Sequence, residues 1–262
     1  MAPSAVLEQL ELGDVAAKTP RLGGMARADG VVIVSERYWA FAGTDGSLKE
    51  GRMPAVPRAL RSLPLARGLV RLAGSLSPLF RRRGVTRRRE RLFLALALVL
   101  PAALAFAPSS IALVIGFALT AVLLSWLLRG RTLYLHGAEH RAIAALEEKR
   151  LCETWHGLAR PSRFSLRCGT NFAALLFPVA LVGGRLWPLP STALTPLVVS
   201  VLALALTMEL WLLVQGSRRV ARIVLLPGLA LQRLTTREPR LDETRVALTA
   251  LAAVLRREQA AM

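Results

Sequence analysis

A stretch from Leu92 to Leu128 without a charged residue constrains the fold of this chain more than any other feature. It is too long for one bilayer-spanning helix, which needs about 20 residues. Pro108 and the two serines after it divide the stretch, which predicts a helical hairpin with arms at about 92–107 and 111–128. Arg91 and Arg129 flank it, so the positive-inside tendency places both ends in the cytosol. The first arm is short for a full bilayer, and a tilted or partly embedded hairpin is the open alternative.

A second apolar region predicts a second hairpin. One arm runs from Phe172 to Gly184 and is interrupted by Pro178; the other runs from Thr192 to Gly216, after a turn that ends at Ser191. Arginines follow this hairpin at 218, 219 and 222, which again indicates the cytosolic side. The predicted fold class is therefore mainly α. It is a polytopic membrane protein with two transmembrane helical hairpins around a cytosolic helix, and a small N-terminal β element.

The remaining residues divide by composition. Short segments rich in β-branched and aromatic residues, 31–34 and 38–42, predict β structure. Between Pro57 and Phe80, arginines interleave with leucines at helical spacing. This suits a helix on an anionic membrane face or one packed on the protein's own core. In chain order we predict a loose or weakly helical leader (1–21), a small β element (22–50), a basic amphipathic segment (57–90), the first membrane hairpin (91–129), a helix and loop (131–168), the second membrane hairpin (169–216) and a cytosolic C-terminal helical tail (217–262) with a helix at about 242–257.

The basic charge of the chain is compatible with two classes of partner, nucleic acid and the anionic headgroups of a membrane. Lys and Arg number 35 against 17 Asp and Glu, a net charge of +18, and 53% of the residues are apolar. A basic chain can bind nucleic acid. Here, however, the arginines crowd the ends of apolar segments, as at 81–83 and 87–91, and no aromatic-rich nucleic-acid module interleaves them. We therefore expect the lipid bilayer and its anionic headgroups as partners and no nucleic acid. The N-terminal residues do not look like a secretory signal, so both termini are expected in the cytosol.

All three histidines and both cysteines lie between His136 and Cys168. The segment begins with His136-Gly137-Ala138-Glu139-His140, an H-x-x-E-H pattern. Residues four apart share a helix face, so His136 and His140 are able to bind one metal ion, and Glu139 would serve as the base that activates water. The alternative is structural: the two histidines are interfacial polar residues and Glu139 is a solvated charge.

A metal bound by two histidines needs a third protein ligand. Cys168 is a soft ligand or, alternatively, a small buried apolar residue. Glu209, the single charge between Leu186 and Gln215, is a ligand candidate or a residue that reaches water at the cytosolic end. We expect Glu147, Arg167 and Thr170 to support the ligands without binding metal. Cys152 and His156 are expected bystanders.

Several motifs together resemble one family. The H-x-x-E-H helix with Glu147, followed by Arg167-Cys168-Gly169-Thr170-Asn171-Phe172, is similar to the YqhQ-like family. The segments Gly23–Ala26, Pro64–Gly68, Met208–Leu210 and Pro227–Pro239 agree with it as well. The resemblance implies an uncharacterised membrane protein of the bacterial cytoplasmic (inner) membrane, labelled as a metal-dependent enzyme. Two positions depart from the family: Ser165-Leu166 stand where a histidine is common, and Arg245 replaces a glutamate.

Three functions are compatible with this sequence. The first is a metal-dependent hydrolase, with zinc as the expected divalent metal, that acts at the cytosolic membrane face. The second is a non-enzymatic membrane scaffold or assembly factor. The third is a transporter or metal-handling protein, for which four short spans are few unless the protein is a homo-oligomer. No residue identifies a substrate.

Overall fold

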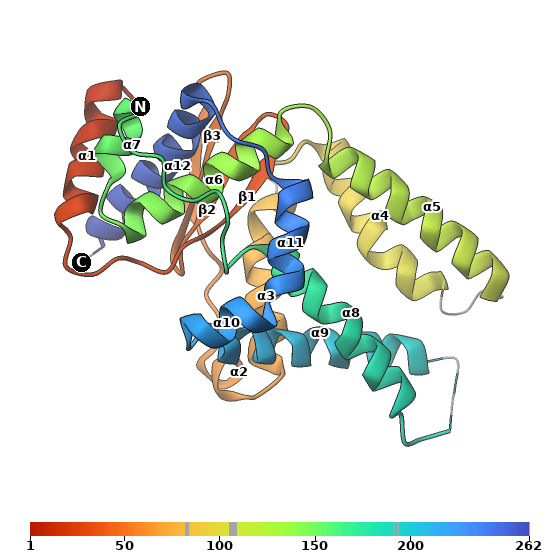
Figure 1. The fold of residues 1–262 in the computed structure, drawn as a ribbon. Coiled ribbons are helices and arrows are strands. Elements are labelled where there is room, and N and C mark those ends of the chain that lie inside the picture. Colours follow the sequence, from red (N-terminus) through yellow and green to blue (C-terminus); the bar gives the residue numbers. More distant parts are fainter. Residues whose placement is uncertain (82–83, 105–108, 191, 193, 262) are drawn as a thin grey trace.

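The computed structural model describes residues 1–262 except 82–83, 105–108, 191, 193 and 262. A small sheet and its covering helices form one end of the molecule, and two pairs of helices extend away from it (Figure 1). We call this end the head. Its helices are α1 (Pro3–Val15), α6 (Thr132–Glu147), α7 (Leu151–His156) and α12 (Leu241–Gln259).

The sheet of the head is an antiparallel meander in the order β1-β2-β3-β4. The strands are β1 (Gly23–Arg27), β2 (Gly30–Val34), β3 (Tyr38–Gly43) and β4 (Leu48–Arg52). The turn before β4 contains Gly46, whose φ of 81° suits a glycine, and the Asp45 carboxylate accepts a hydrogen bond of 3.0 Å from the Ser47 amide. The predicted small β element is thus confirmed.

Side chains of the sheet alternate between two apolar clusters. Val31, Ile33, Ala40 and Ala42 pack with α6 and α12, whereas Val32, Trp39 and Phe41 pack with Val85 on the opposite face. Both faces are covered, which explains why β2 and β3 are apolar along nearly their whole length. The sheet therefore supplies a rigid support for α6.

The end of the chain differs from the predicted helical tail. Helix α12 lies in the centre of the head, against α6, β2 and β3. Its alanines make this possible, because Ala247, Ala250, Ala252 and Ala253 have no exposed surface and allow close approach of neighbouring elements. The helix predicted at about 242–257 corresponds to α12, and the prediction of a cytosolic tail did not include its packing at the centre of the head.

The N-terminal segment, predicted as a loose or weakly helical leader, forms a helix that packs on the head. Helix α1 packs on α12 and α7, and it buries Val6 and Leu10 completely or nearly so. The Asp14 carboxylate accepts hydrogen bonds from the amides of Leu151 and Cys152, at 2.8 and 3.0 Å, at the start of α7. Both ends of the chain therefore belong to the head (Figure 1).

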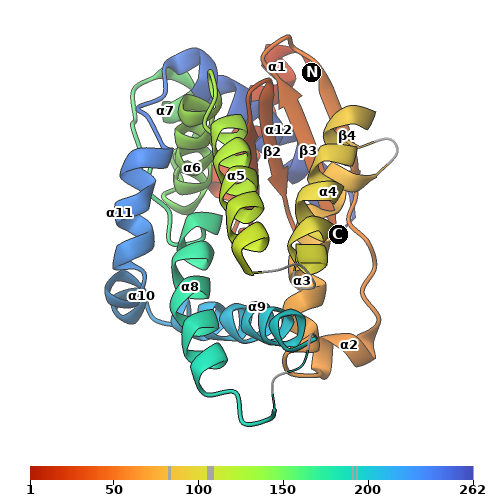
Figure 2. The ribbon, with the colours of Figure 1, turned by 90° about the vertical axis from the view of Figure 1, so that its right-hand side faces the viewer.

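The other helices form the two pairs and their connections. They are α2 (Arg58–Ser62), α3 (Ala66–Phe80), α4 (Arg88–Leu104), α5 (Ser109–Leu127), α8 (Gly169–Arg185), α9 (Thr195–Val214), α10 (Arg218–Val224) and α11 (Leu226–Thr235). Helix α4 pairs with α5, and α8 pairs with α9. Figure 2 shows α4 and α5 in front of the head and α8, α9 and α10 below it. The predicted break at Pro108 and the predicted turn residue Ser191 lie outside the described residues.

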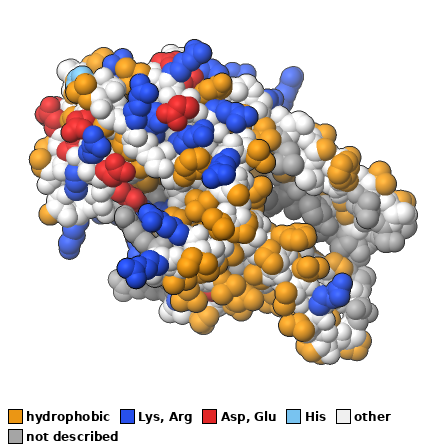
Figure 3. All heavy atoms as spheres, in the orientation of Figure 1, with side chains coloured by type: hydrophobic (Ala, Val, Ile, Leu, Met, Phe, Trp, Pro, Cys, Tyr) orange, Lys and Arg blue, Asp and Glu red, His pale blue; other side chains and the backbone are white. Residues whose placement is uncertain are grey.

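The helix pairs carry exposed apolar side chains. Figure 3 shows charged residues gathered on the head and hydrophobic ones over the helices that extend from it. Phe117 on α5 is 76% exposed, and Phe177 on α8 is 74% exposed. Within the described residues, one helix is long and apolar enough to cross a membrane, namely the 20 residues of α9. We predicted four spanning arms in two hairpins. Of these, α9 alone meets the length and hydropathy of a membrane span within the described residues.

Candidate metal centre

Helix α6 presents His136, Glu139 and His140 on neighbouring positions of one side. The glycine inside the motif allows another segment to pass directly over the helix: a Cβ at Gly137 would come within 2.2 Å of the Arg237 carbonyl oxygen. The Arg237 amide also donates a hydrogen bond of 2.9 Å to the carbonyl of Leu133. The segment after α11 is therefore held against the first half of α6.

Three side chains converge beside this helix. The candidate ligand atoms of His136, His140 and Cys168 all lie within 4.8 Å of one another. Nε2 of His136 is 3.2 Å from Sγ of Cys168, and the two imidazole ring centres are 4.5 Å apart. His136 is half-buried, and the other two residues are buried. The structure thus brings together two imidazoles and a thiol, a donor set that zinc prefers.

Backbone carbonyls orient both imidazole rings. Nδ1 of His136 lies 2.9 Å from the Thr235 carbonyl oxygen, and Nδ1 of His140 lies 2.7 Å from that of Arg163. A carbonyl oxygen only accepts, so each Nδ1 carries a proton, and the neutral form of such a ring has its lone pair on Nε2. Nε2 of His140 is buried and has no hydrogen-bond partner in the described part of the chain. This arrangement resembles metal-binding histidines, whose second nitrogen donates to a carbonyl.

Cys168 occupies the residue before α8. Its sulfur accepts a hydrogen bond of 3.2 Å from the Thr170 hydroxyl. The sulfur thus lies at the N-terminus of a helix, beside a donor hydroxyl and next to the ring of His136. By contrast, burial and the nearby Asp14 raise the pKa of Cys152 to about 11, and His156 bonds the Cys152 carbonyl on α7. Cys152 and His156 do not belong to the cluster.

Glu139 lies next to the cluster without being one of its three members. Its side chain is buried, and desolvation raises its pKa to about 7, an effect that nearby His136 opposes. The carboxylate packs against β1, where a Cβ on Gly24 would come within 2.7 Å of it. The glycine in this strand therefore makes room for a buried acid at the edge of the sheet.

A polar network holds the loop that carries Cys168. The Gln232 amide of α11 donates to the Ser165 carbonyl at 2.8 Å and accepts from the Ser165 amide at 2.9 Å. The side chain of Asn171 donates to the same carbonyl at 2.8 Å. Gly228 admits this packing, since a Cβ there would lie 2.3 Å from Oδ1 of Asn171. Sequence reasoning did not assign roles to these residues, although Asn171 and Gln232 both lie in the motifs shared with the YqhQ-like family.

The structure does not bring Glu209 to the cluster, which corrects its assignment as a candidate third ligand. Its carboxylate accepts hydrogen bonds from Nε of Arg67 at 2.8 Å and from the Leu65 amide at 3.2 Å. The physical reason is that α9 packs against α3, so the nearest cation neutralises the acid. Arg67 was not predicted as its partner. Cys168 takes the third position in the cluster.

Of the other expected supporting residues, Glu147 ends α6 and Arg167 lies in the loop before α8. Nη1 of Arg167 forms an ion pair of 2.7 Å with Oε1 of Glu147. Glu147 therefore contacts the loop that precedes Cys168 rather than a histidine. Of the three predicted supporting residues, Thr170 touches a member of the cluster directly.

The fold and the site define a class of protein: a mainly helical protein with a small antiparallel sheet, one membrane-length apolar helix and a buried His-His-Cys cluster. The family described as "Protein of unknown function (DUF1385)" matches residues 95–257, and the chain belongs to this family.

Over 138 residues, the chain is 32% identical to "Uncharacterized protein YqhQ" of Bacillus subtilis (strain 168), which confirms the resemblance to the YqhQ-like family. The match covers 49% of this chain and 42% of that protein, so the chain spans less than half of the relative's length. No solved structure matches the chain significantly.

Proposed function

We propose that His136, His140 and Cys168 bind one divalent metal ion, with zinc as the best fit. The observation that carries this proposal is the orientation of the histidines. Each donates from Nδ1 to a backbone carbonyl and directs Nε2 into the cluster. Nε2 of His136 lies 3.2 Å from Sγ of Cys168, and Nε2 of His140 is buried without a partner among the described residues. An unpaired buried nitrogen is costly unless something binds it. Two nitrogens and one sulfur form three of the four ligands of a zinc site, the number typical of catalytic sites that keep one position open.

We further propose that the protein is a metal-dependent hydrolase. When bound, a divalent metal supplies Lewis-acid chemistry, since it polarises a carbonyl or phosphoryl oxygen and activates water for attack. Glu139 lies beside the two histidines on α6, and a carboxylate oxygen of its side chain would accept the proton of the attacking water. The surrounding head excludes bulk solvent from Glu139, which is 5% exposed. The hydrolase proposal therefore depends on two conditions: Glu139 lies next to the two histidines on α6, and the histidines bind a metal ion.

Membrane insertion is the second part of the proposal. Helix α9 has 20 residues and would extend about 30 Å, the thickness of the hydrocarbon core. Exposed large apolar side chains continue over α4, α5 and α8, as expected for helices that contact lipid tails. Arginines flank both helix pairs on the side of the head, which supports a multi-pass protein of a bacterial inner membrane with the head and both termini in the cytosol. The basic helix α3 would then lie near anionic headgroups.

Replacing Glu139 by Gln tests the hydrolase proposal. Glutamine keeps the size of the side chain but cannot accept the proton, so E139Q protein should insert, keep its metal and fail to complement a deletion strain. Metal content of the purified protein and growth of the strain are the two readouts. Glu8→Gln is a matched control, because it makes the same change at an exposed acidic residue of the head on α1, away from the cluster. Full complementation by E139Q would reject the hydrolase and favour a non-enzymatic scaffold.

A further inference from the structure

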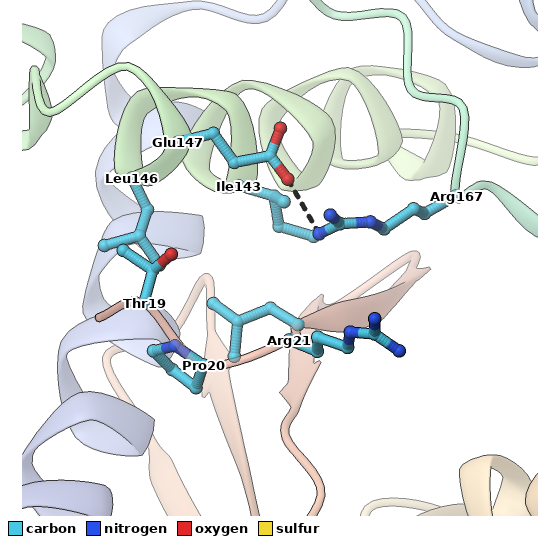
Figure 4. A pocket seen from close by; sticks show the side chains of 8 residues that line it. Thr19, Pro20, Arg21, Ile143, Leu146, Glu147 and Arg167 are labelled. Carbon is cyan, nitrogen blue, oxygen red and sulfur yellow. Dashed lines mark ion pairs between the residues drawn. The ribbon is translucent and has the colours of Figure 1, made fainter. Parts of the chain in front are cut away.

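A cavity of about 240 Å³ lies beside the C-terminal half of α6 (Figure 4). It lies between α6, the segment before β1 and the loop that ends at Cys168. Leu22, Ile143 and Leu146 supply buried apolar walls, and Arg21, Glu147 and Arg167 supply the charges. Its volume is below the roughly 300–1,000 Å³ of sites that enclose a whole small molecule, so it suits one group of a larger ligand.

Each of the three elements that form the cavity also reaches the centre. Ile143 lies four residues after Glu139 and three after His140, so it occupies the next turn on the same side of α6. Arg167 directly precedes Cys168. The segment with Arg21 continues into β1, where Gly24 packs against Glu139. A ligand in the cavity would therefore contact residues that neighbour the members of the cluster along the chain and on α6.

The charges in the cavity are suited to a strong anion. Two arginines and one glutamate line the cavity, and Figure 4 shows Arg167 reaching the Glu147 carboxylate while Arg21 extends along the side of the cavity below Arg167. The ion pair of Arg167 with Glu147 is partly exposed to water, with side-chain exposures of 41% and 35%, and such pairs are weak. A ligand with a single carboxylate would form with Arg167 the same kind of ion pair that Glu147 already forms, so it would not replace Glu147. A phosphate group carries a charge near −2 and more acceptor oxygens, so it would displace Glu147.

We propose that this cavity binds a phosphate group of the substrate between Arg21 and Arg167, with Glu147 as the internal competitor for Arg167. The proposal rests on the proposed metal centre only in calling the bound molecule a substrate. A water-soluble ester and a lipid headgroup both present this phosphate group, and the guanidinium groups recognise the same chemistry in both.

Calorimetric titration of inorganic phosphate into the full-length protein in phosphatidylcholine nanodiscs tests the proposal. Wild type should bind saturably. Arg21→Ala should weaken binding about tenfold or more, because it removes charge-assisted hydrogen bonds. Glu147→Gln should strengthen binding, because it frees Arg167. Arg245→Ala is the matched control: this arginine stacks on Trp155 away from the cavity and should leave the affinity unchanged.

Two further arms identify the source of the phosphate. Soluble glycerol 3-phosphate and nanodiscs that contain phosphatidic acid are compared, and the source is the one whose affinity falls in Arg21→Ala and rises in Glu147→Gln. Absence of saturable phosphate binding, or equal affinity in wild type and both variants, would overturn the proposal. Zinc content of the same samples separates the two claims. Zinc without phosphate binding rejects the cavity alone, and phosphate binding without zinc rejects the metal centre alone.

Discussion

Because Gly137 has no side chain, the segment after α11 can pass directly over α6 at the candidate metal centre. Gly137→Ala would place a Cβ 2.2 Å from the Arg237 carbonyl oxygen, a backbone atom that cannot turn away. We expect a loss of about 1–3 kcal/mol in unfolding free energy, because overpacking outweighs the better helix propensity of alanine. Thermal unfolding measures this. Gly74→Ala on α3 is the control, since its Cβ meets nothing within 4 Å and should be neutral or stabilising.

The residues of the cluster show which side chains can be identified from sequence. The four-residue spacing placed His136 and His140 on one helix face, and Cys168 was named as a candidate ligand because of its chemistry. The carbonyls of Thr235 and Arg163 could not be foreseen, because any residue supplies a carbonyl and only the tertiary fold selects which one meets a ring. The same holds for Arg67 and Glu209, which are far apart in sequence.

Between elements, the Arg67–Glu209 pair connects α3 to α9. The two partners differ in exposure, at 40% for the arginine side chain and 10% for the glutamate. Arg67→Ala should therefore lower the melting temperature more than Glu209→Gln, because it leaves a largely buried carboxylate unpaired. Neither change should remove metal. Loss of metal in Glu209→Gln, with the protein still folded, would restore Glu209 as a ligand.

The local sequence pattern predicted where helices and strands lie better than it predicted how they pack in the fold. The apolar stretches gave helices near the expected positions, and β-branched residues gave the sheet. The burial of α12 in the head could not be predicted from its own sequence, because an amphipathic helix has the same pattern in a peripheral cytosolic tail and in a core. Its contacts with β2, β3 and α1 join residues more than 190 positions apart, and no local signal encodes such contacts.

For the whole molecule, the position of the head fixes a testable topology. Both termini lie in the head, and arginines flank both helix pairs on its side, so the loop between α8 and α9 should face the opposite side of the membrane. A cysteine introduced at Pro190 in a Cys152→Ser background should react with an impermeant thiol reagent in intact cells. One introduced at Arg219 should react only after lysis. The reverse labelling pattern would invert the orientation.

The metal content of the purified protein tests the central claim most directly. Wild-type protein, purified without added metal, should contain about one zinc ion per chain when measured by inductively coupled plasma mass spectrometry. His136→Ala, His140→Ala and Cys168→Ser should each lose most of it, because two ligands hold zinc weakly. His156→Ala and Cys152→Ser change the remaining histidine and cysteine outside the cluster and should retain it. Equal zinc in all five variants, or none in wild type, would contradict the account.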